Sequence, residues 1–377
     1  MKKIIETSVL LILFVLSTSC NDGYSSSTNP EPKLVTLNQL PHQPWGMDFL
    51  PDGRIVVSQR NGSLSILSAD GTSIITTLSI PNIHYNSQGG LLDVVVDPDF
   101  DTTPWVYWSY TELDQATFLT GTAVAKGQLI NNSLSNISVI YRQLPKLTSE
   151  AHYGSRLVFA DDKTLFVTLG DRRNRDYVQD LSSSVGKIIR INRDGSAAGA
   201  NPTYSASNAL AEIWSYGHRN PQGAAIHPTT RELWVSEHGP QGGDELNRSL
   251  AGSNYGWPVR SYGCEYSSPV GDNCRIGGGT HAPDYTEPVS FWVPVSIAPA
   301  GIAFYTGDDF PEWQGDLFIA ALADKAVWRV SLKGNTVSHR ERLFAELTER
   351  IRDVNLGPDG KLYLLTDSGK LIQVRHN

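Results

Sequence analysis

Residues 358–367 read PDGKLYLLTD, a tight-turn sequence followed by a short apolar run. Pro358, Asp359 and Gly360 are residue types that favour a reverse turn, and the Leu, Tyr and Thr residues after them favour a β-strand. The same arrangement occurs at residues 51–59, where PDG precedes RIVVSQ. A turn of this kind followed by a short strand in which apolar and polar residues partly alternate predicts antiparallel β-structure at both ends of the chain.

Further copies of this turn-strand unit lie between those two. They share a short polar turn followed by a strand, and they occupy residues 97–110, 161–171, 229–239 and 314–322. Several units continue into a second strand, at residues 63–67, 187–191, 326–330 and 370–374. Six units in about 345 residues give roughly 55–60 residues each, which is the size of a propeller blade.

These repeats predict an all-β protein, a six-bladed β-propeller of four-stranded antiparallel blades with long loops on its top face, over residues 34–377. A pair of packed β-sheets would explain the strands but not six similar units. Because the units are unevenly spaced, we expect long inserted loops near residues 112–150, 194–212 and 252–300. Propellers bind ligands at the mouth of the central channel, so these loops are where chemistry is expected.

The composition agrees with a large folded β-protein. The chain has 377 residues, of which 40% are hydrophobic, and this content argues against intrinsic disorder. Its 9 Trp and 15 Tyr favour strands and ring-lined pockets, whereas only 2 Met and no long helix-forming runs argue against a helical bundle. A formal net charge of -8 disfavours a nucleic-acid binder.

The first 20 residues predict an export signal. Lys2 and Lys3 precede an apolar run at residues 9–16, which is too short to span a membrane. Small residues then lead to Cys20, an arrangement that resembles a bacterial lipoprotein cleavage site except for Ser17, where Leu is usual. A lipid anchor at Cys20 and plain secretion both remain open. Either places the protein in the periplasm or cell envelope, with residues 21–33 as a flexible tether.

Two further cysteines, Cys264 and Cys274, lie close together in a Gly- and Ser-rich stretch. In an exported protein such a pair predicts a local disulfide. No CxxC motif or Cys/His cluster indicates zinc.

Polar residues with glycine neighbours gather in a few loop segments: residues 87–92, 151–157, 217–223, 237–245, 252–258 and 349–353. Glycine allows a ligand to approach the backbone, and free carbonyl oxygens can bind a hard cation. Arg350 and Arg352 alternate along a strand, so they can share a ligand-binding side, although a solvated face explains them equally well. Trp45 and Trp257 are interpreted as packing residues. The histidines outside these loop segments, such as His339, are interpreted as structural residues.

Together these segments resemble the soluble sugar dehydrogenases that use pyrroloquinoline quinone (PQQ), most closely their bacterial aldose sugar dehydrogenase branch. The resemblance covers roughly residues 34–375. Its strings occur in the family's order: PWGMDFLPDGRIVVSQRNG, QGGLLDVVVDPDF, HYGSRLVF, GKIIRINRDG, GHRNPQG, SEHGPQGGDELN, GSNYGWP and RIRDVNLGPDGKLYLLTD.

The resemblance implies a site with PQQ and Ca²⁺ in the top cleft. His152 matches the catalytic base, and Gln88 matches a polar residue beside the quinone. Arg219 and Asn220 match residues that contact cofactor and substrate near the reactive carbonyl. The basic pair Arg350 and Arg352 matches the residues that bind the PQQ carboxylates, for which planar guanidinium groups are suited.

The resemblance also implies metal ligands. Gly239 and Pro240 match positions whose backbone oxygens hold the calcium at PQQ. Glu245 and Tyr255 look like ligands of a further structural calcium. Calcium beside a quinone would act as a Lewis acid on the carbonyl that accepts hydride.

Two departures from the family pattern concern the cofactor. Ala151 stands where some members place an acidic residue before the catalytic His, and Ala323 stands where some place a Lys near the PQQ carboxylates. Lys325 is the candidate substitute, so it is included among the expected cofactor-binding residues.

The resulting hypothesis is a PQQ- and calcium-dependent oxidation of aldose sugars at C1 to lactones, with electrons passed to an external acceptor. Two other functions remain open. A calcium-dependent lactonase would need several Asp, Asn or Glu side chains converging on the channel, whereas this sequence offers Arg and backbone ligands. A non-enzymatic carbohydrate-binding propeller would need a broken base or a broken Arg pair, whereas both are present here.

Overall fold

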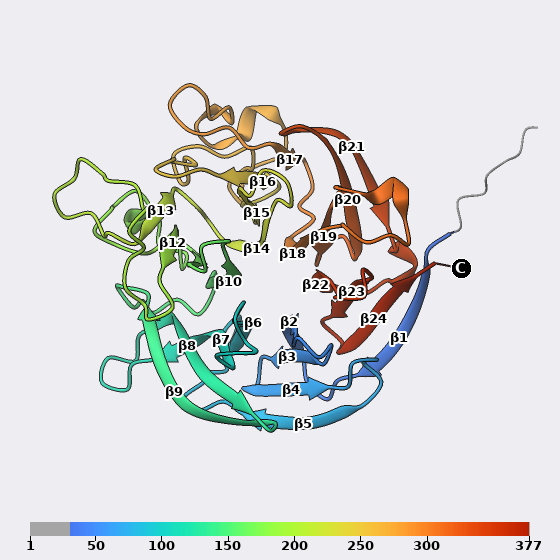
Figure 1. Ribbon diagram of the computed structural model, residues 1–377. Coiled ribbons are helices and arrows are strands. Elements are labelled where there is room, and N and C mark those ends of the chain that lie inside the picture. Colours follow the sequence, from blue (N-terminus) through green and yellow to red (C-terminus); the bar gives the residue numbers. More distant parts are fainter. Residues whose placement is uncertain (1–30, 377) are drawn as a thin grey trace, which may run out of the picture.

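The computed structural model describes residues 31–376 and contains six four-stranded antiparallel sheets arranged in a ring (Figure 1). This confirms the predicted six-bladed propeller and excludes a β-sandwich. The expected export signal, and the expected tether up to residue 30, lie outside the described residues. Across residues 31–376, none of the helices has the length and apolar character needed to cross a membrane.

Each blade pairs four strands in an antiparallel order. Blade 1 consists of β2 (Pro44–Phe49), β3 (Ile55–Gln59), β4 (Ser63–Leu67) and β5 (Ile74–Ser79). Blade 2 consists of β6 (Leu91–Val96), β7 (Trp105–Leu113), β8 (Thr120–Ile130) and β9 (Ser133–Arg142). Blade 3 consists of β10 (Gly154–Phe159), β11 (Leu165–Leu169), β12 (Lys187–Ile191) and β13 (Ile213–Tyr216).

The second half of the ring is built the same way. Blade 4 consists of β14 (Pro221–Ile226), β15 (Leu233–Glu237), β16 (Asp244–Ser249) and β17 (Ser290–Trp292). Blade 5 consists of β18 (Pro299–Phe304), β19 (Leu317–Ala321), β20 (Ala326–Lys333) and β21 (Thr336–Leu343). Blade 6 consists of β22 (Ile351–Leu356), β23 (Leu362–Thr366), β24 (Lys370–Arg375) and β1 (Lys33–Gln39). Short 3₁₀ turns occupy the connections: η1 (Arg175–Tyr177), η2 (Asp272–Cys274), η3 (Ile276–Gly278), η4 (Pro311–Trp313) and η5 (Ala345–Leu347).

Blade 6 closes the ring with strands from both ends of the described chain. β1 lies at its outer edge and pairs antiparallel with β24, in a register that places Leu34 opposite Val374. The first and last strands are therefore held together by backbone hydrogen bonds, and no blade interface is left open.

The predicted turn-strand units correspond to the second strand of each blade: β3, β7, β11, β15, β19 and β23. Residues 63–67, 187–191 and 370–374 were also expected as strands and fall in β4, β12 and β24. Each second strand lies inside a sheet and is buried on both faces, as the pattern of β3, β11 and β19 shows. This burial explains why its sequence is the most recognisable.

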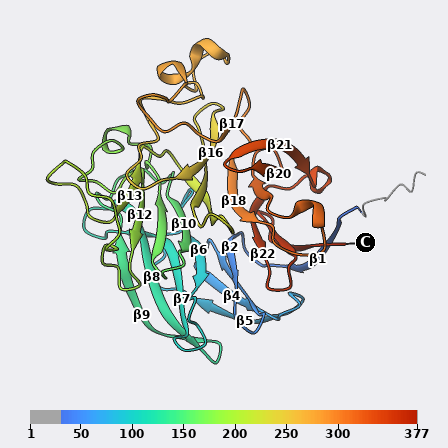
Figure 2. The same ribbon diagram turned by 45° about the horizontal axis from the view of Figure 1, so that its top comes forward.

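One expected loop was wrong. Most of residues 112–150 form a long hairpin, with β8 paired along its length to β9. β9 is largely exposed and rich in Ser and Asn, so its sequence lacks the apolar alternation of a strand. Residues 194–212 lie in the connection between β12 and β13, as expected. The segment between β16 and β17 is also a long connection, and it projects from the ring (Figure 2). It contains the predicted disulfide between Cys264 and Cys274.

The hydrophobic core lies between the blades rather than within one centre. In one cluster, Tyr107 and Val124 of blade 2 contact Leu157 and Val167 of blade 3, and all four side chains are buried. Comparable clusters join the other neighbouring blades within residues 31–376. Blade packing therefore fixes the position of every inner strand around the axis.

The inner strands β2, β6, β10, β14, β18 and β22 surround the central axis (Figure 1). Because each blade is antiparallel, its second and fourth strands end where the first strand begins. The connections from strand two to three, and from strand four to the next blade, thus gather at one end of the ring. The turns of the repeated sequence unit lie at the opposite end.

A buried ionic cluster links the inner strands near the axis. The Arg156 guanidinium (β10) donates from Nη1 to Asp93 Oδ1 (β6, 2.9 Å) and lies 3.1 Å from Asp353 Oδ1 (β22). The carboxylates also accept backbone hydrogen bonds from Leu157 and Met47. A Cβ on Gly301 would lie 1.8 Å from Asp353 Oδ1, so glycine is required on the neighbouring inner strand. One side chain thus joins three blades.

Burial raises the pKa of Asp93 to about 7 and also raises the pKa of Asp353, while Arg156 opposes both shifts. A carboxylate whose folded-state pKa exceeds its unfolded value binds more protons in the folded state. Its contribution therefore favours folding below about pH 4 and is lost as the pH rises through the folded-state pKa. Arg156 limits this loss at neutral pH.

Replacing Arg156 with Met (Arg156→Met) should lower the free energy of unfolding by about 3–5 kcal/mol, because two buried carboxylates lose their counter-ion. The loss should be larger at pH 8 than at pH 5, where Asp93 and Asp353 can take up protons. Urea unfolding at both pH values measures it. Arg231→Met, which breaks a half-exposed pair with Asp161, is the control and should cost less than about 1 kcal/mol. A pH-independent loss for Arg156→Met would contradict this account.

Candidate active site

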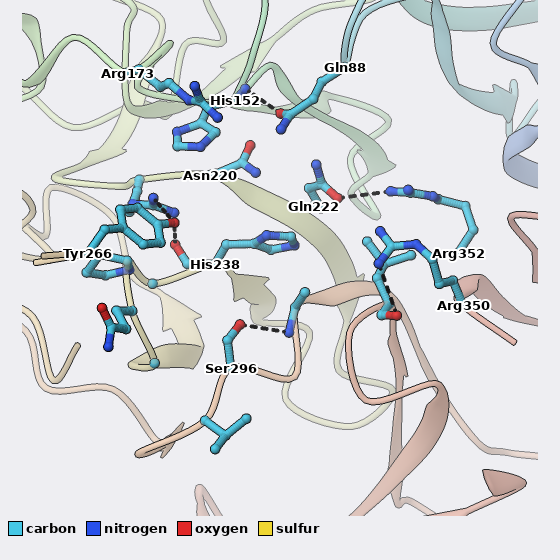
Figure 3. A pocket seen from close by; sticks show the side chains of 18 of the residues that line it. Gln88, His152, Arg173, Asn220, Gln222, His238, Tyr266, Ser296, Arg350 and Arg352 are labelled. Atoms are coloured by element: carbon cyan, nitrogen blue, oxygen red, sulfur yellow. Dashed lines mark hydrogen bonds between the residues drawn. The ribbon is translucent and has the colours of Figure 1, made fainter. Parts of the chain in front are cut away.

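A cavity of about 820 Å³ lies at the end of the ring where the inner strands begin. The segments leading into all six inner strands contribute to its lining, so it is central to the propeller. Eight of the residues predicted from the sequence line it: Gln88, His152, Arg219, Asn220, Gly239, Pro240, Arg350 and Arg352. Figure 3 shows most of these side chains around one space. Residues from distant parts of the chain are therefore brought together.

His152 lies directly before β10 and is held from three sides. Its backbone has a left-handed φ of 54°, and its N–H donates to Gln88 Oε1 at 2.9 Å. On the ring, Nδ1 lies 2.7 Å from Asp171 Oδ1. Asp171 Oδ2 in turn accepts a hydrogen bond from the Trp257 indole N–H at 2.8 Å. These contacts fix both the backbone and the ring of His152.

The Asp171 contact determines the tautomer of His152. An ionised carboxylate can only accept hydrogen bonds, so Nδ1 carries the proton and Nε2 keeps its lone pair. Burial lowers the pKa of His152 below its ordinary value, opposed by the hydrogen bond and charge of Asp171. Burial raises the pKa of Asp171, but the contact with His152 and the positive charge of Arg219 outweigh it and hold that pKa below its usual range. The pair is therefore a neutral imidazole beside an ionised carboxylate, which suits a general base.

Arg350 and Arg352 enter the cavity from the start of blade 6. Both bind Asp367, with Arg350 Nε at 2.8 Å from Oδ2 and Arg352 Nε at 2.9 Å from Oδ1. Arg352 Nη1 also donates to Gln222 Oε1 at 3.1 Å. Burial raises the pKa of Asp367, but the two arginines more than offset this effect and keep the group ionised. Arg352 is buried and Arg350 is about half exposed, and Asp367 holds both guanidinium groups at the cavity.

Arg219 and Asn220 precede β14 on another side of the cavity. Arg219 donates to the His238 carbonyl oxygen at 3.2 Å and to the Tyr266 hydroxyl at 3.1 Å. Asn220 Oδ1 accepts from the N–H of Gly154, at 3.2 Å. The bond from Arg219 to His238 fixes it to blade 4, and the bond from Gly154 to Asn220 fixes that residue to blade 3.

The loop between β15 and β16 brings Gly239 and Pro240 to the cavity wall. A Cβ on Gly239 would lie 2.3 Å from the Gly242 carbonyl oxygen, so this tight loop requires glycine there. The Gly239 N–H donates to Asp244 Oδ1 at 2.9 Å. Within residues 31–376, no hydrogen bond is donated to the carbonyl oxygens of Gly239 and Pro240. Both oxygens remain available as ligands for a hard cation.

Glu245 and Tyr255 lie behind this loop, around a second, much smaller cavity that Glu237 also lines. Burial and the neighbouring Glu237 raise the pKa of Glu245 well above its ordinary value. Asn247 donates to both carboxylates, yet its buried Oδ1 has no hydrogen-bond partner among the described residues. The Tyr255 hydroxyl instead donates to the Arg248 carbonyl oxygen. Its phenol oxygen is therefore engaged with backbone, unlike the carboxylate of Glu245.

Lys325 does not line the cavity, contrary to expectation. It lies in the tight turn between β19 and β20, is exposed, and has a left-handed φ of 53°. Leu322 is the residue of this turn that reaches the cavity, and its carbonyl oxygen accepts from Arg350 at 3.2 Å. Ala323 is exposed and Ala151 is buried, with its carbonyl oxygen bonded to Arg172.

Sequence reasoning missed several residues of this site. Asp171 was part of a predicted strand unit but was not identified as a partner of His152. The two residues face each other at the open end of the β10–β11 hairpin, whose register pairs Gly154 with Leu169. Trp257 was interpreted as a packing residue, although its indole N–H binds Asp171. Other missed lining residues are Gln43, Arg60, Arg173, Gln222, His238, Tyr266 and Asp367. The adjacency of Asp171 to a strand end was the one available signal.

The whole propeller matches a known protein family. Residues 41–373 match the family model described as Glucose / Sorbosone dehydrogenase. The chain is 42% identical over 346 residues to the aldose sugar dehydrogenase YliI of Escherichia coli, which covers 90% of this chain and 91% of that protein.

Solved structures agree with the match. The apo form of the soluble aldose sugar dehydrogenase of Escherichia coli superposes with a TM-score of 0.85 at 39% identity, covering 92% of this chain and 100% of that chain. The PQQ-bound form of an aldose sugar dehydrogenase from Streptomyces coelicolor superposes with a TM-score of 0.74 at 26% identity, covering 92% and 100%. The similarity extends over the blades and the cavity-lining loops alike. The chain belongs to the glucose/sorbosone dehydrogenase family.

Proposed function

We propose that this protein is a PQQ- and calcium-dependent dehydrogenase that oxidises aldose sugars at C1 to lactones, with His152 as the general base. The observation that carries the proposal is the convergence of His152, supported by Asp171, and the basic pair Arg350 and Arg352 on one central cavity. Relatives described as aldose sugar dehydrogenases, one of them in a PQQ-bound form, support the cofactor and the substrate class. Export to the cell envelope, with or without a lipid at Cys20, and an external electron acceptor belong to the same proposal.

The chemistry of the lining fits an anionic cofactor. Five arginines line the cavity, and Asp367 is the one acidic residue of the described range that does. PQQ carries three carboxylates, and Arg350 and Arg352 present guanidinium groups suited to bind them. Gln88 uses Oε1 to hold His152, which leaves its amide NH₂ as a donor toward a bound ring.

The calcium positions fit by their donor sets. The carbonyl oxygens of Gly239 and Pro240 are hard ligands at the wall of the same cavity. Behind them, Glu237 and Glu245 are buried carboxylates close to the unpartnered Oδ1 of Asn247. A cation there would relieve the repulsion that raises the pKa of Glu245. Glu245 is therefore proposed as a ligand of a structural calcium, whereas no such role is proposed for the Tyr255 hydroxyl.

PQQ held by Arg350 and Arg352 next to calcium would supply an electrophilic carbonyl able to accept a hydride. His152 receives the proton of the C1 hydroxyl at Nε2, while Asp171 holds the ring and stabilises the imidazolium that forms. Arg219 and Asn220 are placed to bind and orient the sugar beside this base. When the C1 hydroxyl loses its proton to His152 and the C1 carbon loses its hydrogen as hydride, C1 and its oxygen become the lactone carbonyl.

The central experiment is to reconstitute the protein with PQQ and Ca²⁺ and to measure dye reduction with a panel of aldoses. We expect quinone binding, seen by its visible absorption, and sugar-dependent bleaching of the dye. A folded protein that binds no PQQ would refute the proposal. Lactone hydrolysis without PQQ would favour a lactonase, and sugar binding without dye reduction would favour a carbohydrate-binding protein.

His152→Ala should reduce kcat by about 10²–10⁴-fold, the usual contribution of a positioned general base, while PQQ binding stays intact. Stopped-flow dye reduction and the absorption spectrum measure the two effects separately. His339→Ala, on the exposed face of β21, is the control and should leave kcat unchanged. Turnover by His152→Ala at the wild-type rate would clear His152 of this role.

Asp171→Asn should lower the maximal kcat/KM and move its acidic limb to lower pH. The carboxylate raises the pKa of His152, so its removal lets burial depress that pKa further. The rate itself falls because an amide no longer enforces the Nδ1–H tautomer. The pH profile of kcat/KM is the measurement, and Asp176→Asn, an exposed residue of the same connection, is the control. An acidic limb that moves upward would refute this role for Asp171.

Calcium removal should lower the melting temperature of the wild type, and Glu245→Gln should reduce that calcium dependence. In chelator, Glu245→Gln should melt above the wild type, because it removes one of two repelling buried carboxylates. With saturating Ca²⁺ the order should reverse, since binding to the folded state adds stability that the variant has lost. Thermal melts with EGTA and with CaCl₂ test this crossover, and equal calcium shifts in both proteins would refute a calcium ligand at Glu245.

A further inference from the structure

Arg173 is a cationic residue of the cavity that the proposed chemistry does not use. It lines the cavity together with His152, and its positive charge is one of those that lower the pKa of His152. Figure 3 shows it on the His152 side, whereas Arg350 and Arg352 lie on the opposite side of the space. Its guanidinium is exposed and forms no hydrogen bond or ion pair with any residue in 31–376.

The other cavity arginines are all engaged. Arg350 and Arg352 bind Asp367, Arg219 binds His238 and Tyr266, and Arg60 binds Gln43 and the Gly89 carbonyl oxygen. Nearby Arg175, outside the cavity, pairs with Glu265 at 2.6 Å. Arg173 thus differs from each of these arginines, because the N–H donors of its guanidinium have no acceptor among residues 31–376.

The backbone holds Arg173 in place. Arg172 and Arg173 are consecutive non-glycine residues in the left-handed region, with φ values of 53° and 54°. The Arg173 N–H donates to Asp171 Oδ1 at 2.8 Å, the same oxygen that contacts His152. Such strain persists only where surrounding contacts impose it, and it is typical of functional sites. One carboxylate therefore positions both the ring of His152 and the backbone of Arg173.

The charge of the cavity leaves Arg173 without a counter-ion even after the cofactor is bound. Five arginines and one aspartate line the cavity, and His238 is neutral because burial lowers its pKa to about 3. Three cofactor carboxylates would not offset the net positive charge of these residues together with the two charges of the proposed calcium. Arg173 and Arg219 both lie near the catalytic base, where the substrate must lie, but Arg219 is already bonded to His238 and Tyr266.

We infer that Arg173 selects aldoses that carry an anionic group remote from C1, either a carboxylate, as in a uronic acid, or a phosphate. This inference rests on the proposed function and specifies its substrate class. A planar guanidinium forms paired hydrogen bonds with either group, and its partial exposure accommodates substituents that extend toward solvent. The reaction at C1 is unchanged; Arg173 acts on binding.

The test uses the protein loaded with PQQ and Ca²⁺ and compares D-glucose with D-glucuronate and D-glucose 6-phosphate. We expect the wild type to prefer at least one anionic sugar, and the arm that responds identifies carboxylate or phosphate. Arg173→Gln should lower kcat/KM for that sugar by about tenfold, mainly through KM, as for loss of a charged hydrogen bond at a partly exposed site. Its kcat/KM for glucose should change by less than about threefold. Arg175→Gln is the matched control and should leave the ratio unchanged.

High salt should reduce the wild-type preference, because screening weakens an exposed charge pair, and should have little effect on Arg173→Gln. Equal losses for glucose and the anionic sugars, no loss at all, or weaker PQQ binding by Arg173→Gln would overturn the inference. Glucose oxidation separates the two claims. Turnover of glucose with an unaltered substrate ratio refutes only the role of Arg173, whereas a loaded protein that oxidises none of the three sugars refutes the proposed function as well.

Discussion

Pairing of β1 with β24 closes the ring, and the geometry of the site depends on that closure. Apolar clusters join each blade to its neighbours, and near the axis Arg156 of blade 3 also contacts Asp353 of blade 6. Without the interface between blade 6 and blade 1, the inner strands could move apart. Residues from opposite blades would then no longer be held at a fixed distance from the axis. Closure holds His152 of blade 3 and Arg352 of blade 6 across one cavity.

Inside this frame, most groups of the cavity are positioned by partners that lie behind them. Asp171 orients His152, Asp367 holds Arg350 and Arg352, and Asp244 binds the loop of Gly239. Each carboxylate comes from a strand end or a strand connection. The cavity therefore presents neutral imidazole, guanidinium and carbonyl groups to a ligand. The three carboxylates bind these groups and hold them in position.

Much of this was available from the sequence. The second strand of each blade is buried on both faces, so its apolar run and preceding turn are visible as a repeat. β9 is an outer strand with polar, exposed residues, so residues 112–150 were mistaken for a loop. Eight site residues were identified by resemblance to family motifs. The contact of Asp171 with His152 depends on the register of the β10–β11 hairpin, and the placement of Lys325 depends on the shape of the β19–β20 turn. A linear pattern encodes neither.

The sixth blade also constrains when folding can finish. Its outer strand is the first of the described chain and its other three are the last, so β1 waits unpaired until residues 370–375 have been made. Contacts of such sequence separation form slowly, since a very long loop must close first. The ring therefore cannot close before residues 370–375 are available to pair with β1.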